Sequence, residues 1–209
     1  MKGRTQNFLA LLVVAALSGC AGTKNLELEG NFPVPLITKL PVNMGILLDD
    51  ELRQFTYNET IEGKGEWNVA VGSAQETLFT RLADGMFEAH SFTAEVTGTN
   101  LDAVLKPKIT DLQFSLPEQT RSNFYEVWIR YQFQLYDADG NVVAEWPLPA
   151  YGKASKKDFG NAFRGVEAAA IAACRDAMAF FAINFSKEPK VKAWLGNNQL
   201  IKPAGGPTS

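Results

Sequence analysis

The sequence is poor in the residue types on which most catalytic and metal sites depend. Among 209 residues there is one histidine, His90, and there are two cysteines, Cys20 and Cys174. These do not supply the ligand set of a usual zinc site. No Gly-x-Ser-x-Gly turn, phosphate-binding loop or Gly-x-Gly-x-x-Gly motif occurs either. We therefore expect no enzyme, no metal and no cofactor, and we interpret His90 as the polar end of a helix.

Long apolar runs and an excess of basic charge are also absent. The longest apolar run, residues 8–17, is about half of the roughly 20 residues that a membrane span needs. The chain has 20 basic and 23 acidic residues, and two of the basic ones precede residue 20, so the remainder carries about −5. This balance argues against nucleic acid as a partner and provides no polybasic stretch for anionic lipid.

What is present at the start is a leader followed by a cysteine. Lys2 and Arg4 precede the apolar run, which is typical of a secretory signal that is removed. The next residues, Leu17-Ser18-Gly19-Cys20, resemble the lipobox of bacterial lipoproteins. The resemblance implies cleavage before Cys20 and lipidation of that residue by a diacylglyceryl group and an acyl chain such as palmitate. An ordinary cleavable signal that contains a cysteine is the alternative.

The residues after Cys20 indicate the membrane to which the protein is sorted, and lipidation of Cys20 determines whether Cys174 has a disulfide partner. In bacterial lipoproteins, Asp directly after the lipidated cysteine favours retention at the inner membrane, whereas Ala21 and Gly22 follow Cys20 here. The resemblance therefore implies the outer membrane, with the protein facing the periplasm. A lipidated Cys20 cannot form a disulfide, which leaves Cys174 alone in an oxidising compartment. Because alanines surround it, we interpret Cys174 as a buried core residue.

Composition divides the chain into four parts. Residues 1–19 are the leader, and residues 20–41 form a flexible tether that contains Pro33, Pro35 and Pro41. Residues 42–195 form a single α+β domain. Residues 196–209 are rich in Asn, Gly and Pro and form a disordered tail.

Two helices are predicted from apolar residues at steps of three and four. The first opens at Ser73, which with Glu76 can form a capping box, and carries the stripe Leu78, Phe79, Leu82, Met86 and Phe87. The second spans residues 160–185, with the stripe Phe163, Val166, Ala170, Cys174, Ala177, Phe181 and Phe185. Its many alanines favour close packing on a sheet.

Alternation predicts strands over 42–48, 67–71, 92–96, 103–116, 125–136 and 142–150. Pro107 indicates an edge or a bulge, and regular pairing is expected to stop at Trp146-Pro147-Leu148-Pro149. Residues 137–141 predict a hairpin turn rather than a calcium loop, because the glycine comes too early for the EF-hand pattern. The acidic run 49–51 is interpreted as a loop or helix start rather than a cation site.

These elements predict a two-layer α+β sandwich, with a mostly antiparallel sheet covered on one face by two helices. The stretches "LDAVLKPKITDLQF" and "YEVWIRYQFQLYDADGNVVAEW", followed by an Ala-rich last helix, resemble small periplasmic lipoproteins of Gram-negative bacteria. The groups in question are auxiliary lipoproteins of ABC-type transport systems and LptE-like lipopolysaccharide-assembly lipoproteins. The resemblance implies a non-catalytic accessory subunit of an envelope transport or assembly system.

The strand over 125–136 also carries the candidate partner surface. Trp128, Arg130 and Tyr136 lie on the face opposite the core, and we expect Trp146 to join them. Such residues are enriched at protein interfaces, although they also cover one another on ordinary solvated sheet faces. The alternative function is a lipid or glycolipid carrier with an apolar pocket between sheet and helices. A cavity of several hundred cubic ångströms would favour the carrier, and a filled core the accessory subunit.

Overall fold

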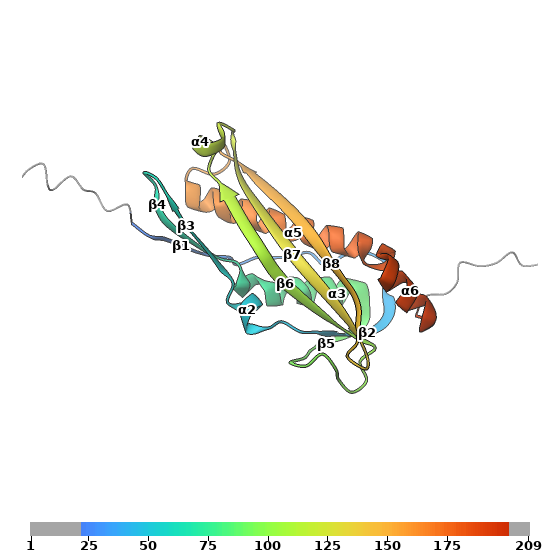
Figure 1. Ribbon diagram of the computed structural model, residues 1–209. Coiled ribbons are helices and arrows are strands. Elements are labelled where there is room, and N and C mark those ends of the chain that lie inside the picture. Colours follow the sequence, from blue (N-terminus) through green and yellow to red (C-terminus); the bar gives the residue numbers. More distant parts are fainter. Residues whose placement is uncertain (1–21, 201–209) are drawn as a thin grey trace, which may run out of the picture.

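A computed structural model describes residues 22–200 and shows an α+β fold of two layers (Figure 1). One layer is a five-stranded sheet in the order β5-β2-β6-β7-β8, of which β6, β7 and β8 cross the front of Figure 1. Its strands are β2 (Leu40–Ile46), β5 (Phe87–Phe92), β6 (Ala103–Ser115), β7 (Phe124–Asp137) and β8 (Val142–Ser155). The last three pair antiparallel, whereas β2 is parallel to both β5 and β6. The predicted α+β class is confirmed, with a mixed sheet.

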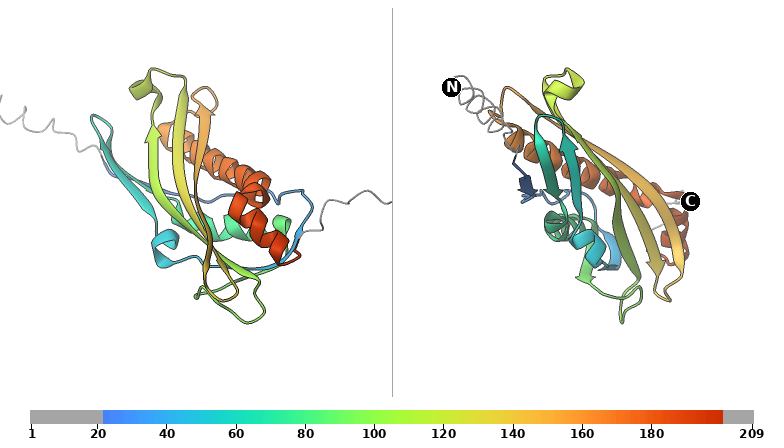
Figure 2. Two further views of the ribbon diagram at one scale, coloured as in Figure 1. Left: turned by 45° about the vertical axis from the view of Figure 1, so that its right-hand side comes forward. Right: turned by 60° about the vertical axis from the view of Figure 1, so that its left-hand side comes forward.

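The second layer combines two helices with a small sheet. Helix α5 (Ala162–Asn184) lies along β7 and β8, and α3 (Gln75–Met86) lies beside it, as Figure 2 shows from two further directions. The small sheet has the order β1-β4-β3, from Lys24–Glu27, Gly65–Ala70 and Thr56–Ile61. It packs on β6 where Trp67 meets Phe114 with ring centroids 5.3 Å apart. The shorter elements are α2 (Asp50–Arg53), η2 (Gly72–Ala74), α4 (Pro117–Thr120), η3 (Phe185–Lys187) and α6 (Pro189–Asn197).

The domain begins earlier than the composition indicates. Strand β1 pairs in parallel with β4, and Leu26, Leu28 and Phe32 are buried in the core. The expected tether over 20–41 is therefore wrong from residue 24 onward, because alternating leucines fill the space beside β4. The leader and Cys20 lie outside the described residues.

The end of the chain is also more ordered than expected. Helix α6 continues to Asn197, and Leu200 packs against the core, so the predicted tail does not begin at residue 196. Residues 201–209 lie outside the described part.

Both predicted helices are confirmed, with changes at the first one. Its stripe is fully buried, but η2 precedes it, and the capping box does not form. Instead the Ser73 hydroxyl donates to the carbonyl of Leu28 at 3.2 Å, and Glu76 pairs with Arg53. The chain passes directly from α3 into β5, so His90 lies in a strand rather than at a helix end. The strand expected over 92–96 is wrong, since β5 ends at Phe92.

Close packing between α5 and the sheet depends on Gly152 in β8. A Cβ atom at this position would lie 2.1 Å from the carbonyl oxygen of Ala169 and 2.2 Å from the backbone nitrogen of Ala173. The helix backbone therefore rests directly on the strand, as the alanine content predicts. Along the second-helix stripe, Phe163 alone is exposed.

The interpretation of Cys174 as a core residue is confirmed. Its side chain is completely buried, and its sulfur lies 3.9 Å from the hydroxyl of Tyr131. Burial raises the pKa of the Cys174 thiol to about 12, which keeps it in the unreactive neutral form. The Tyr131 hydroxyl donates to the buried amide of Gln75 at 3.2 Å, so the polar groups here satisfy one another.

The outer edge of β8 is regular, against the expectation that pairing stops at its prolines. The ladder with β7 continues through Pro147 and Pro149 to Ser155. Proline is tolerated because β8 is an edge strand, where an N–H directed outward has no partner in the sheet. Tyr151, at the next such position, donates its N–H to Asp176 of α5 at 3.0 Å. Three successive outward positions therefore offer no free donor.

The remaining turn and edge predictions are confirmed. Strand β2 pairs with β6 only at residues 103–105, so Pro107 lies on an open edge, with a register shift after Ile109. Residues 137–141 form a hairpin turn in which Gly140 has a φ of 82° and the Asp137 carboxylate accepts two backbone N–H groups. Asp49 caps α2 by accepting from the Leu52 N–H, so the acidic run is a helix start.

Candidate partner-binding surface

The outer face of the large sheet carries an exposed aromatic pair. Trp128 of β7 lies opposite Tyr151 of β8 in the register, and their ring centroids are 5.3 Å apart. Trp128 is 40% exposed and Tyr151 is 38% exposed. We call these two residues the outer-face aromatic pair. Exposed aromatics on a rigid sheet present a large contact area with little entropy to lose on binding.

Hydrogen bonding fixes Tyr151, one member of this pair, in place. The Tyr151 hydroxyl donates to Glu126 Oε1 at 2.6 Å, and this bond, with a contribution from burial, raises the pKa of Tyr151 to about 12. The backbone of Tyr151 is held by Asp176 of α5 as well. The ring therefore stays neutral and oriented at physiological pH.

A shallow hollow of about 260 Å³ adjoins the pair. Its polar lining residues are Asp111, Gln113 and Arg130, and Pro149 forms part of its rim. Among the described residues, Arg130 has no ion-pair partner. An exposed Trp next to a free Arg is the composition of protein-interface hot spots. The structure thus brings Trp128 and Arg130 together, as the sequence predicts.

The other two predicted residues do not belong to this cluster. Tyr136 lies on the same face, but eight residues along β7 correspond to about 27 Å, and its hydroxyl is bound to Gln134. The placement of Trp146 on this face is wrong. It lies on the inner face, stacked on Phe133 at 5.6 Å and on Phe181 at 6.1 Å, because a register shift between Leu135 and Tyr136 turns the even-numbered residues of β8 inward from Ala144 onward.

Tyr151 is the member that the sequence reasoning missed. The return strand was expected to become irregular before reaching it. Continuing the alternation through both prolines would have placed Tyr151 opposite Trp128.

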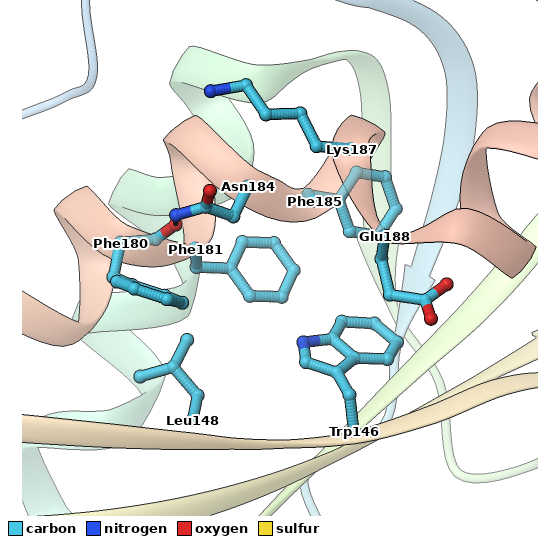
Figure 3. Close-up of a pocket in the computed structure, with 8 residues that line it drawn as sticks. All are labelled: Trp146, Leu148, Phe180, Phe181, Asn184, Phe185, Lys187 and Glu188. Carbon is cyan, nitrogen blue, oxygen red and sulfur yellow. Dashed lines mark hydrogen bonds between the residues drawn. The ribbon is translucent and has the colours of Figure 1, made fainter.

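A second hollow lies at the end of α5, as Figure 3 shows. It has a volume of about 270 Å³, and Trp146, Leu148, Phe180, Phe181 and Phe185 point toward one another around it. It lies below the usual size of ligand pockets. The space between the layers is filled beside it, with Phe133 and Phe181 only 4.7 Å apart. The packing thus favours a filled core over a carrier cavity.

Residues 22–200 offer neither a cluster of metal ligands nor a membrane-spanning helix. No group of three or more His, Cys, Asp or Glu side chains there could hold a metal ion. None of the helices in this range combines the length and apolarity that crossing a membrane requires.

Comparison with known proteins supports the fold alone. No family model and no curated protein matches the sequence. Among solved structures, a Xanthomonas campestris protein of family DUF330 is similar with a TM-score of 0.53 and 12% identity, covering 85% of this chain and 99% of that one. A minor lipoprotein from Acinetobacter baumannii reaches a TM-score of 0.37 at 15% identity, over 73% and 94% of the two chains. The chain therefore shares an α+β architecture with the first of these proteins.

Proposed function

We propose that the mature chain is a lipid-anchored, non-catalytic accessory subunit that binds a protein of the bacterial envelope. The observation that carries this proposal is the outer-face aromatic pair, in which Trp128 packs on a hydrogen-bonded Tyr151 beside the exposed Arg130. The lipobox at Cys20 supports the anchor, and Ala21 supports the periplasmic face of the outer membrane. An accessory role in an envelope transport or assembly system is the function that such a surface serves best.

The test is capture of the partner in intact cells of the native host. After crosslinking and mass spectrometry of the wild type, Trp128→Ala is expected to lower recovery of the same partner at least about tenfold, since hot-spot truncations cost about 2 kcal/mol or more. Tyr136→Ala is the matched control, because it removes an aromatic residue from the same face outside the pair. Equal recovery with Trp128→Ala and the wild type would refute this surface.

The anchor is tested separately on the same material. The N-terminal peptide of the purified protein should begin at Cys20 and carry the mass of its acyl groups. An unmodified cysteine, or recovery of the protein from the cytosol, would refute the anchor.

The hollow beside Trp146 makes a lipid or glycolipid carrier the second candidate. Aromatic side chains form much of its wall, but Asn184, Lys187 and Glu188 also line it, and it opens to solvent and leads into a filled core. Native mass spectrometry of the protein released from membranes distinguishes the two functions. A stoichiometric bound lipid, beyond the one on Cys20, would favour the carrier.

A further inference from the structure

The first strand begins so close to the lipidation site that it limits how the domain can lie on a membrane. Thr23 is already fixed, since its hydroxyl donates to Glu66 Oε2 at 3.1 Å, and Lys24 begins β1. Three residue steps separate Cys20 from Thr23, which is a reach of about 10 Å at full extension. The chain leaves no room for the spacer of 20 residues that composition suggests.

Three connections lie at the end of the domain where the chain enters. Lys24 reaches the β3–β4 turn, because its amino group donates to the carbonyl of Lys64. In α4 the carboxylate of Glu118 accepts a hydrogen bond from the amino group of Lys156 at 2.7 Å, and this bond is the main reason that the pKa of Glu118 is lowered, with a smaller contribution from the charge of Lys64. We call this the anchor end, made of residues 22–24, 62–66, 116–123 and 156–164. Figure 1 shows α4, the β3–β4 turn and the start of α5 together there.

The anchor end differs in charge from the rest of the protein. It gathers six basic residues and four acidic ones, namely Lys24, Lys64, Arg121, Lys156, Lys157 and Arg164 against Glu62, Glu66, Glu118 and Asp158. Its net charge of +2 contrasts with about −5 for the chain after residue 19. No stretch of the sequence is polybasic, and the fold brings these residues together from four separate segments.

We propose that the anchor end rests on the bilayer and that its basic side chains contact anionic phospholipid headgroups. This inference rests on the proposed lipid anchor but not on the proposed protein partner. The hairpin turn at residues 137–141 then points away from the bilayer, because β7 spans about 44 Å between its ends. The outer-face aromatic pair, near the start of β7, is held close to the membrane surface.

The experiment uses the lipidated protein in vesicles of phosphatidylethanolamine and phosphatidylglycerol that carry a headgroup nitroxide quencher. Fluorophores are attached at Glu62→Cys and, in a second sample, at Asp139→Cys in the far turn. Both substitutions remove one negative charge, and the buried Cys174 does not react. The probe at residue 62 is expected to lose most of its fluorescence, and the probe at residue 139 none. Equal loss at both positions, or loss at residue 139 alone, would overturn the proposed orientation.

A charge reversal tests the headgroup contact. Lys64→Glu with Lys157→Glu should lower the ratio of contacting to detached domains at least about 25-fold, since the loss of each basic residue near an anionic surface costs a factor of about five and each new carboxylate is repelled as well. The matched control is Lys190→Glu with Lys192→Glu on α6, which changes the net charge equally. The same loss of quenching in both double variants would overturn the role of the anchor end. Absence of lipid on residue 20 would overturn orientation and anchor together, whereas loss of partner capture alone leaves the orientation intact.

Discussion

Gly152→Ala should be among the most destabilising single-methyl additions in this protein. The new Cβ would meet three backbone atoms of α5 at once, with the closest contact, to the carbonyl oxygen of Ala169, at 2.1 Å. An ordinary contact begins near 3.4 Å, so the helix must move by more than 1 Å away from β8. Overpacking of a core typically costs about 1–3 kcal/mol, and we expect the upper end because backbone cannot rotate aside. For a domain of this size about 3 kcal/mol lowers the melting temperature by roughly 6–12 °C.

The assay is urea and thermal unfolding of the mature chain with Cys20→Ser, followed by tryptophan fluorescence. Gly160→Ala is the matched control, since nothing lies within 4 Å of a Cβ there, and it should be neutral or slightly stabilising. Ala173→Gly should fail to rescue Gly152→Ala, because the contact is with the backbone nitrogen rather than the methyl group. A melting temperature within 1 °C of the wild type, or full rescue by Ala173→Gly, would refute the close contact.

Three further predictions follow from the core and the edge. Trp146→Ala should lower the free energy of unfolding by about 3 kcal/mol, because the ring stacks on Phe133 and Phe181. Trp128→Ala should lower it by less than about 1.5 kcal/mol, because this ring is partly exposed. Equal midpoints of urea unfolding for the two variants would contradict the assignment of Trp146 to the inner face and Trp128 to the outer face. The raised pKa values of Cys174, to about 12, and of Tyr131 mean that the folded state holds these protons more tightly than the unfolded state. The contribution of these two groups to the free energy of unfolding should therefore be fully present below pH 9 and should be lost between pH 9 and 12. Cys174→Ala should make the fall in the free energy of unfolding over this pH range less steep. Pro147→Thr with Pro149→Thr restores two edge donors and should increase self-association in sedimentation velocity, while Val142→Thr, which adds no N–H, should not.

The helices and the central hairpin could be predicted because their signals are local. Period two along residues 125–136 identifies β7 and its buried face, and the spacing from Leu78 to Met86 identifies α3. The buried position of Cys174 follows from the same kind of periodicity. These features depend on neighbours in the sequence, so a single chain is sufficient to find them.

The misplaced elements depend on partners far away in the chain. Strand β1 has only four residues and exists because β4 offers it an edge 43 residues later. Phe87 fits the stripe of α3 but begins β5, since β2 provides a parallel partner. The inward face of Trp146 depends on the register shift between Leu135 and Tyr136, which the sequence does not signal. The outward face of Tyr151 also requires the ladder to continue through two prolines, which is possible only at a sheet edge.

The closed edge of β8 has a consequence under the proposed lipid anchor, which would hold the protein on a surface. Molecules confined to a bilayer meet one another far more often than the same number in a volume, and always in similar orientations. An open strand would then invite copies to extend one another's sheets into fibres. Pro147, Pro149 and the Asp176 carboxylate remove three docking points along that strand. A high density of copies in the membrane is thereby compatible with each remaining a separate molecule.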